Sequence, residues 1–312
     1  MNKFFKKGIL TGLLSSPKEI DDKYFYDEQG NKLFEKVMNL KKYYLTNCEH
    51  EIFSSKKAEL LSIFSKNTKE FHIIEFGVGN GYKTKVLLNY FLKQKANFKY
   101  FPVDISTYIL KKLETDLIHT FPKLQIKSVN NDYFKALKEL NNHKNVKKII
   151  FFIGNSFGNF SEKKSVKFLN KISGYLTKKD LLFIGFDLKK DPFIIYDAYD
   201  KTFEPFCMRI FKKMNDELGG NFNTSKFKYY FTYNPKNGQG NFYLISKEEQ
   251  TAELKKLKIN IHFKAWETIY VGISQKYDID YINRLAKKTG LKIKYIFFDK
   301  KKYFIDSVLS LK

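Results

Sequence analysis

Short apolar runs alternate with amphipathic segments between residues 71 and 187. Apolar runs of this length, bounded by polar or turn residues, predict strands that are buried on both faces. The segments between them, for example 83–94, 107–121 and 162–176, repeat their apolar positions with helical spacing. The predicted strands are 71–76, 98–103, 124–129, 148–153 and 181–186. Strands that alternate with helices at this interval predict βαβ units and an α/β fold, with a parallel sheet between two layers of helices.

The alternation stops after Asp187. Residues 190–265 begin with one long helical pattern and continue with two short strand patterns, 229–233 and 241–245, joined by the turn sequence PKNGQG. A further strand is predicted at 267–273. This order predicts a lobe that is inserted before the last strands of the sheet.

Two strand patterns near the C-terminus, 291–298 and 303–309, predict a closing hairpin of the sheet. The N-terminal segment has helical patterns and is expected to join the inserted lobe. We therefore predict two domains: a Rossmann-like domain of residues 63–195 and 274–312, and a lobe of residues 1–62 and 196–273.

The first predicted strand runs directly into a glycine-rich turn, Glu75-Phe76-Gly77-Val78-Gly79-Asn80-Gly81. Glycines allow the backbone to approach a ligand closely, and the helix that starts near Lys83 offers free N–H groups. The spacing is neither the dinucleotide fingerprint G-x-G-x-x-G nor a P-loop. An acid before the glycines disfavours a pyrophosphate and suits a cofactor with a cationic end, such as S-adenosylmethionine. A tight structural turn is the alternative.

Three later strands also end in polar residues. Asp104 lies 27 residues after Gly77, where a carboxylate can accept both hydroxyls of a ribose. Asp132 and Tyr133 follow the third strand, where an acid and an aromatic ring can bond and stack an adenine. The fourth strand ends in the polar sequence 154–160. Each of these is also compatible with a turn or a helix cap. However, the carboxyl ends of parallel strands share one edge of the sheet, where such folds bind ligands.

The chain carries a formal net charge of +24, from 57 Lys and Arg against 33 Asp and Glu. Such a balance can indicate a nucleic-acid or anionic-membrane partner. Arginine makes the bidentate contacts to phosphate and guanine, but it occurs only at Arg209 and Arg284. The lysines are spread along the whole chain. We therefore interpret them mainly as solvated faces and expect no nucleic-acid partner, with a polyanion partner as the alternative.

Neither a membrane span nor a metal site is predicted. No stretch approaches about eighteen uncharged apolar residues, and the apolar run 9–14 is too short for the core of a signal peptide. Two cysteines, Cys48 and Cys207, exclude a disulfide framework, and the five histidines have no metal-binding spacing. We expect a cytoplasmic protein without a metal.

Specific segments occur throughout the chain. They are YFYDEQGNKLF at 24–34, YYLTNCE at 43–49, the glycine loop up to Thr84, PVDIS at 102–106, GNF at 158–160, AYD at 198–200, NDEL at 215–218 and SQKY at 274–277. With them the chain resembles the histidine N-alpha-methyltransferases of the ergothioneine pathway, enzymes that use S-adenosylmethionine to make trimethylhistidine. The resemblance covers nearly the whole chain, and the YFYDExG…LF…YY pattern is its most specific part.

The resemblance implies which residues hold the cofactor. It assigns S-adenosylmethionine to residues at the ends of three strands: Gly77 and Gly79 with Lys83, then Asp104, then Asp132 and Tyr133. Lys83 would lie at the carboxylate of the cofactor.

The resemblance also implies how a small amino-acid substrate is held. Asn159 and Tyr199 would bind its carboxylate, and Ser274 remains as a polar contact. Tyr26 and Tyr43 would line the reaction centre, with Tyr26 orienting the amine and Tyr43 forming a wall.

Two positions depart from the family. Gly272 stands where the family has a glutamate that recognises the imidazole, and Phe242 stands where it has a methionine. A site that hydrogen-bonds a polar ring rejects other side chains strongly, because its buried polar groups would go unpaired. Without that acid, another aromatic or larger amino acid becomes a possible substrate beside histidine.

We predict an S-adenosylmethionine-dependent N-methyltransferase. Its substrate is the α-amino group of a free amino acid, histidine or a histidine-like or aromatic one, with up to three methyl groups added. The alternatives are a nucleic-acid-associated (RNA) methyltransferase or binder, and a protein that binds S-adenosylmethionine without catalysis.

Overall fold

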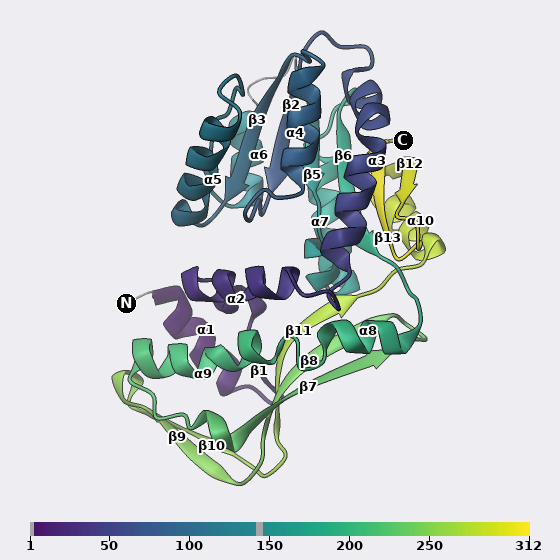
Figure 1. The fold of residues 1–312 in the computed structure, drawn as a ribbon. Helices are drawn as coiled ribbons and strands as arrows, with labels where there is room; N and C mark the ends of the chain where they lie inside the picture. Colours follow the sequence, from purple (N-terminus) through teal and green to yellow (C-terminus); the bar gives the residue numbers. More distant parts are fainter. Residues whose placement is uncertain (1–2, 142–145) are drawn as a thin grey trace. The chain divides into compact units, whose positions relative to one another are not determined.

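The computed structural model describes residues 3–141 and 146–312. The chain divides into two compact units (Figure 1). We call one of them the lobe, which comprises Met1–Tyr44 and Lys190–Ser274. The other is the sheet unit, which comprises Leu45–Lys189 and Gln275–Lys312.

The sheet unit is built on a sheet of seven strands, as counted over the described residues, in the order β12-β13-β6-β5-β2-β3-β4. The strands are β2 (Phe71–Phe76), β3 (Phe98–Asp104), β4 (Val129–Asn130), β5 (Lys147–Phe152), β6 (Leu181–Asp187), β12 (Leu291–Phe298) and β13 (Phe304–Leu311). All pairs from β4 to β6 are parallel, whereas β13 is antiparallel to both β6 and β12. The chain reverses the direction of strand addition between β2 and β5, where open α/β sheets form a ligand crevice.

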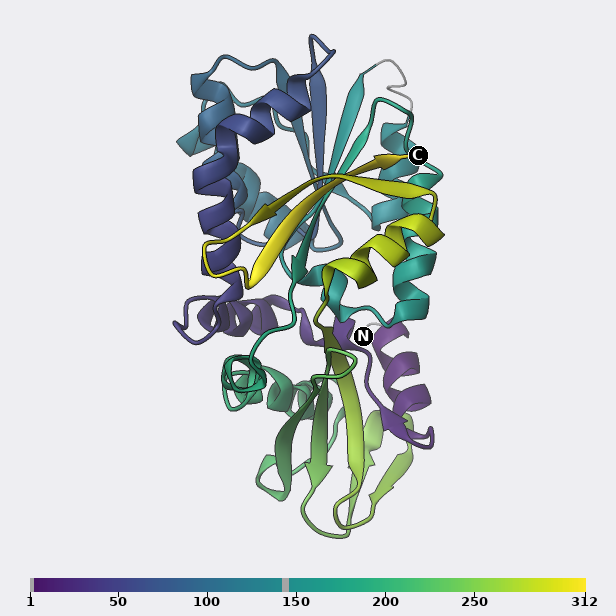
Figure 2. The same ribbon diagram turned by 90° about the vertical axis from the view of Figure 1, so that its right-hand side faces the viewer.

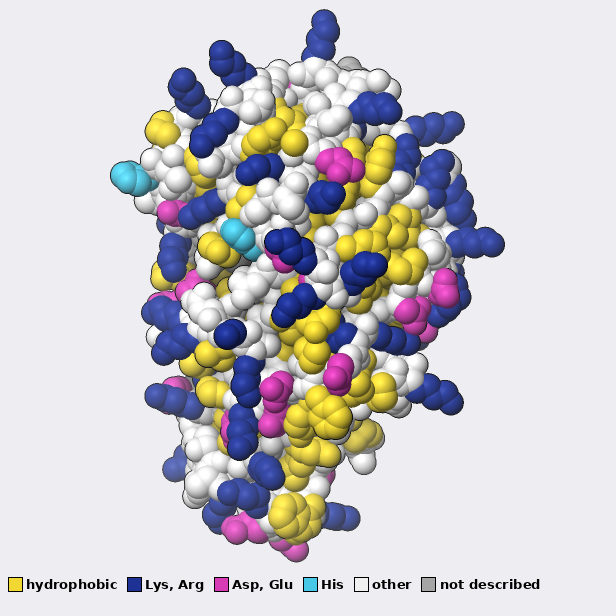
Figure 3. All heavy atoms as spheres, turned by 45° about the vertical axis from the view of Figure 1, so that its right-hand side comes forward, with side chains coloured by type: hydrophobic (Ala, Val, Ile, Leu, Met, Phe, Trp, Pro, Cys, Tyr) yellow, Lys and Arg dark blue, Asp and Glu magenta, His cyan; other side chains and the backbone are white. Residues whose placement is uncertain are grey.

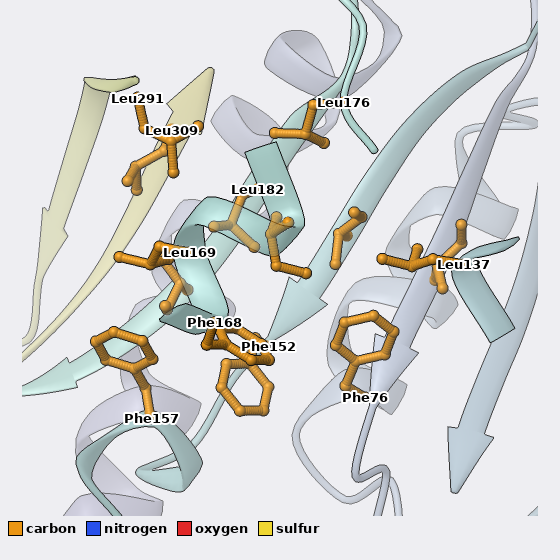
Figure 4. Close-up of a cluster of buried hydrophobic side chains, with 14 of the residues drawn as sticks. Phe76, Leu137, Phe152, Phe157, Phe168, Leu169, Leu176, Leu182, Leu291 and Leu309 are labelled. Carbon is orange, nitrogen blue, oxygen red and sulfur yellow. The ribbon is translucent and has the colours of Figure 1, made fainter. Parts of the chain in front are cut away.

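Helices cover both faces of this sheet (Figure 2). They are α3 (Leu45–Ser65), α4 (Thr84–Lys93), α5 (Thr107–Thr120), α6 (Tyr133–Leu140), α7 (Glu162–Ser173) and α10 (Ile279–Lys288). The cluster in Figure 4 joins α6, α7 and α10 to one face through side chains such as Phe152, Phe168 and Leu182. On the other face, α3 packs against α4. Because both faces are covered, every residue of β2, β5 and β6 is buried, which confirms the predicted α/β fold.

The strand predicted at 124–129 is much shorter in the structure. Only Val129–Asn130 forms a strand, with one isolated bridge between Ile126 and Tyr100 upstream of it. This segment is at the edge of the sheet and pairs with β3 alone, and Gln125 and Lys127 are exposed. An edge segment with polar side chains gains less from burial than a central strand.

The lobe contains a four-stranded sheet in the order β1-β11-β8-β7 and a two-stranded sheet of β9 and β10 (Figure 1). Its strands are β1 (Lys18–Glu19), β7 (Phe227–Asn234), β8 (Gln239–Ser246), β9 (Gln250–Leu254), β10 (Ile259–Phe263) and β11 (Thr268–Gln275). Its α-helices are α1 (Lys3–Leu13), α2 (Glu28–Met38), α8 (Pro192–Tyr199) and α9 (Glu204–Leu218), and a 3-10 helix, η1, spans Asp22–Phe25. The predicted hairpin around PKNGQG is the β7–β8 pair.

The single long helix predicted after residue 190 is in fact two helices. α8 ends at Tyr199, and α9 begins at Glu204 with Pro205 in its first turn. Proline suits the first turn of a helix because the N–H that it lacks would have no partner there. The apolar pattern continues through Phe203, which explains why the break is not visible in the periodicity.

The boundaries of the two units differ from the predicted domains. Residues 45–62, assigned above to the lobe, form most of α3 in the sheet unit, and the later boundary falls after Lys189 rather than after residue 195. The reason is packing: Phe53 of α3 contacts the ring of Phe183 of β6 at 5.6 Å between centroids. A helical pattern shows which face of a helix is apolar, but not which sheet covers it.

Phe152 provides a test of the core. It is 1% exposed, and its ring stacks on Phe168 at 4.7 Å. We expect Phe152→Ala to lower the free energy of unfolding by about 3–5 kcal/mol, because it removes buried area and leaves a cavity. Phe298→Ala, at a 38% exposed position of the same unit, is the matched control. Urea unfolding of both variants measures the difference, and equal effects would contradict this description of the core.

Candidate active site

The glycine loop connects β2 to α4 in the sheet unit. Gly77 and Gly79 have φ values of +65° and +54°, which side chains rarely adopt. A Cβ on Gly79 would meet no atom within 4 Å, whereas one on Gly81 would lie 2.6 Å from a methyl group of Leu113. Gly79 therefore borders open space, as a backbone that approaches a ligand requires.

Glu75, the acid before the glycines, has a structural role. It is 2% exposed, and its carboxyl oxygens accept hydrogen bonds from Thr84 Oγ1 at 2.9 Å and Tyr100 OH at 2.7 Å. Burial raises the pKa of Glu75 to about 7. The prediction that this acid presents its charge to the ligand is therefore wrong. Instead, it anchors the start of α4 to β2 and β3 beneath the loop.

Asp104 lies at the end of β3, as predicted. Its Oδ1 accepts the Ser106 N–H at 2.8 Å, and burial raises the pKa of its carboxyl. The backbone carbonyl of Asp104 accepts Asn130 Nδ2 at 3.0 Å, so a second contact also holds this strand end. Its role toward a ribose stays a prediction.

Asp132 caps α6 and is followed by a well-packed tyrosine. Its Oδ1 accepts the N–H groups of Phe134 at 3.1 Å and Lys135 at 3.0 Å, and the Lys135 N–H lowers the pKa of Asp132. Tyr133 stacks on Phe76 at 4.6 Å between ring centroids. The capping role that the sequence left open is therefore present, and the predicted adenine contact stays a prediction.

Lys83 is close to the strand end that follows β5. Its Nζ forms an ion pair with Glu49 of α3, and it lies 3.2 Å from the position of a Cβ on Gly154. Glu49 is fully buried, and its Oε1 accepts the Gly154 N–H at 2.5 Å. Thus α3, the glycine loop and the end of β5 meet at the point where the strand order reverses.

The sequence analysis gave Glu49 no role, although it lies inside one of the segments that carry the family resemblance. No local pattern marks it, because a buried acid on a helix becomes recognisable only with its partner. Asn159 ends a 3-10 helix, Ser156–Asn159, that follows β5, and it is half-buried.

The predicted substrate residues of the lobe belong to one aromatic cluster. Tyr43 is buried, and its ring meets Tyr199 at 5.9 Å and Phe34 at 6.2 Å. Tyr26 is 37% exposed and meets the same Phe34 at 5.8 Å. Phe34 thus links the two tyrosines that the resemblance places at the reaction centre, although sequence reasoning did not single it out.

Tyr199 joins this cluster to the strands of the lobe. Ser274 Oγ donates to Tyr199 OH at 3.1 Å, and Tyr229 OH donates to the Tyr199 carbonyl at 2.7 Å. The ring of Phe242 lies 5.7 Å from that of Tyr199. The structure therefore brings Tyr43, Tyr199, Phe242 and Ser274 together within the lobe.

Gly272 lies beside Phe242 and beside an acid. The Ile20 N–H donates to the Tyr270 carbonyl at 2.8 Å, which extends the pairing of β1 with β11. The following residues bring the Cβ of Asp22 to 3.7 Å from the position of a Cβ on Gly272, and Phe242 Cδ2 lies at the same distance. Gly272 has a φ of +154°, so a side chain there would be strained. Asp22 is half-buried.

In the face shown in Figure 3, Lys and Arg side chains are dispersed among acidic and apolar ones. Within residues 3–141 and 146–312, no cluster of three or more His, Cys, Asp or Glu side chains has the arrangement of a metal site. In the same ranges, no helix has the length and apolar character to cross a membrane. Both cysteines are buried, and burial raises the pKa of Cys207.

The fold and the glycine loop define a Rossmann-like methyltransferase, in which an antiparallel strand, β13, is inserted beside β6 of a parallel sheet. The family described as histidine-specific, S-adenosylmethionine-dependent methyltransferases matches residues 5–311. The chain belongs to this family, and it is an S-adenosylmethionine-dependent N-methyltransferase. The predicted resemblance is thereby confirmed.

The chain is also similar to several named proteins. The histidine N-alpha-methyltransferase of Mycobacterium tuberculosis is 26% identical over 275 residues, which cover 87% of this chain and 84% of that protein. Ergothioneine biosynthesis protein 1 of Schizosaccharomyces pombe is 31% identical over 239 residues, which cover 72% of this chain and 30% of that protein. Among solved structures, magnesium protoporphyrin IX methyltransferase of Synechocystis PCC 6803 aligns with a TM-score of 0.48 and 10% identity, over 93% of this chain and 98% of that one.

The buried Glu75 makes stability depend on pH. Its pKa is higher in the folded chain than in the unfolded one, so the folded chain binds more protons between about pH 4.5 and 7. The free energy of unfolding therefore falls as the pH rises through this window. We expect Glu75→Gln to remove up to about 3 kcal/mol of that fall.

Urea unfolding of both proteins at several pH values measures this difference. Glu59→Gln, at an exposed acid of α3 that pairs with Lys56, is the control that should leave the fall unchanged. If wild type and Glu75→Gln share one pH profile, Glu75 is not the titrating group.

Proposed function

We propose that this enzyme transfers methyl groups from S-adenosylmethionine to the α-amino group of free histidine, up to the trimethylated product. The observation that carries the proposal is the extent of the family match, because residues 5–311 include both the sheet unit and the lobe. The cofactor residues and the substrate residues proposed below therefore both lie inside the matched segment.

The sheet unit has features that fit S-adenosylmethionine, which supplies an activated methyl group. The open space at Gly79 and the partly buried carboxyl of Asp104 are suited to a ligand at the carboxyl edge of the sheet. Lys83 would bind the carboxylate of the cofactor, and one Glu49 contact leaves it further N–H donors. Gly77, Asp132 and Tyr133 complete the proposed set.

The lobe has features that fit an amino-acid substrate. Tyr199 and Ser274 would supply hydroxyl groups for the substrate carboxylate, and the family resemblance adds Asn159 as a third proposed contact. The half-exposed Tyr26 would orient the amine, and Tyr43 would wall the site. Aromatic rings also attract an ammonium that gains methyl groups, by about 0.5–2 kcal/mol for each well-placed ring.

Alignment of the reacting groups can lower the barrier by roughly 7–11 kcal/mol. The α-ammonium must first lose one proton, which a water molecule would take, so that the nitrogen lone pair can attack the methyl carbon. The bond from that carbon to sulfur breaks, and S-adenosylhomocysteine leaves.

Asp22 supports histidine as the substrate despite Gly272. The Cβ of Asp22 and the Cδ2 of Phe242 each lie 3.7 Å from the position of a Cβ on Gly272. We propose that the Asp22 carboxylate accepts the imidazole N–H and thereby supplies the acid that position 272 lacks. In this chain the φ of Gly272, +154°, disfavours any side chain at that position.

The first experiment incubates the purified protein with S-adenosylmethionine and a panel of amines, and reads the products by mass spectrometry. The panel contains histidine, phenylalanine, tyrosine, tryptophan and histamine, which lacks the carboxylate. We expect one to three methyl groups on histidine and none on histamine. Methylation of another amine with histidine untouched would overturn the substrate assignment. Cofactor binding without any product would support the non-catalytic alternative, and steeply salt-dependent RNA binding would support the RNA alternative.

The second experiment tests the proposed role of Asp22. We expect Asp22→Asn to raise the KM for histidine by about tenfold or more, because a charge-assisted hydrogen bond is lost. The affinity for S-adenosylhomocysteine should not change. Glu248→Gln is the matched control, since Glu248 is an exposed acid of the lobe that pairs with Lys226. A KM within twofold of wild type in Asp22→Asn would show that Asp22 does not recognise the imidazole.

A further inference from the structure

A second buried acid lies next to Glu49. Asp306 of β13 is fully buried, and it is directly opposite Gly185 of β6 in the sheet register. A Cβ on Gly185 would lie 2.9 Å from Glu49 Oε1, so only glycine leaves room for the Glu49 carboxyl at this point. Residues opposite each other in antiparallel strands present their side chains on the same face. The Asp306 and Glu49 carboxyl groups therefore meet inside the sheet unit.

Two buried carboxyl groups in contact cannot both be ionised. Among the described residues, no donor group reaches either carboxyl oxygen of Asp306. Burial together with the neighbouring Glu49 holds the pKa of Asp306 well above its usual range. Glu49 already accepts the Gly154 N–H and pairs with Lys83, both of which stabilise its negative charge. The shared proton is therefore assigned to Asp306, which donates it to Glu49.

The charges around this pair can be counted. Lys83 contributes one positive charge, and the singly protonated pair contributes one negative charge. Glu75 of β2 is the other acid whose charge interacts with both Glu49 and Lys83. When the pair holds its proton, its single negative charge balances the positive charge of Lys83. When the proton leaves, a second negative charge appears beside Lys83 and repels any carboxylate that binds there.

We propose that Glu49 and Asp306 are positioning residues of the cofactor site. Glu49 fixes the Lys83 ammonium at the end of β5. The proton on Asp306 keeps that ammonium able to bind the cofactor carboxylate. This inference rests on the proposed function, because it assumes that the carboxylate of S-adenosylmethionine binds Lys83. Neither acid touches the reacting atoms.

Infrared spectroscopy detects the shared proton directly. A protonated carboxyl group has a carbonyl band separate from that of carboxylates. The measurement uses a Glu75→Gln background, so that Glu75 adds no band of its own. At about pH 7 we expect a buried carboxyl band that is lost in Asp306→Asn. The band should persist in Ser307→Ala, a buried neighbour on the same strand. Absence of this band from the Glu75→Gln protein would contradict the proposal that the two carboxyl groups share a proton. This outcome can be read without a folded Asp306 variant.

Titration with S-adenosylhomocysteine tests the link to the cofactor. Asparagine imitates a protonated aspartate, so Asp306→Asn should bind this probe within about twofold of the background at about pH 7. We then raise the pH to about 9. The affinity of the Glu75→Gln protein for the probe should fall only in the pH range in which the carboxyl band disappears, and the fall should approach tenfold per pH unit. In Asp306→Asn the affinity should follow only the titration of the probe itself.

The outcomes separate the two proposals. An affinity that changes while the band does not, or that changes equally in both proteins, would overturn the positioning role. Absence of probe binding by wild type at about pH 7 would instead count against the proposed function and leave the infrared result to decide the carboxyl pair.

Discussion

The burial of β2 and β5 on both faces is the constraint on which the rest of the sheet unit depends. Parallel neighbours that are covered by helices on both sides have only their ends available for polar side chains. Their carboxyl ends lie together, and the strand order reverses between them. The glycine loop after β2 and the polar turn after β5 therefore lie side by side. Lys83 and Gly154 meet at this point through Glu49.

The buried acids near the glycine loop each have specific hydrogen-bond or ion-pair partners. Glu75 bonds to Thr84 and Tyr100, while Glu49 bonds to Lys83 and Gly154. Unpaired charges at such depth would strongly destabilise the fold, so each acid is either paired or protonated. The same contacts that satisfy these groups also hold the loop and the lysine in place. In the proposed cofactor site, the same hydrogen bonds thus serve both the stability of the fold and the binding of the cofactor.

The lobe supplies a different chemistry. Its proposed substrate residues are mostly aromatic rings in contact with one another, with few hydroxyl groups among them. Aromatic rings attract a methylated ammonium through cation–π interactions, which suits a product with several methyl groups. In the proposed role of Asp22, recognition of the imidazole moves from position 272 to a neighbouring segment. The pairing of β1 with β11 makes this exchange possible.

The sequence by itself determined the class of fold, the central strands and the glycine loop. These features depend on local spacing: a strand buried on both faces is continuously apolar, and a turn with positive φ requires glycine. The family segments also located most of the proposed site residues, including Tyr26, Tyr43 and Asp104. The short edge strand and the break before α9 were misjudged, because local periodicity does not report pairing or helix ends.

Only the tertiary structure decided which distant residues meet. Glu49 and Asp306 are far apart in the chain, and they come together because α3 packs on the strand that pairs with β13. Asp22 reaches Gly272 because two strands from opposite ends of the lobe sequence run in register. The same information was needed to see that Glu75 is an anchor rather than a charge at the ligand. Contacts of this kind depend on register and burial, and neither quantity is contained in the pattern of a single segment.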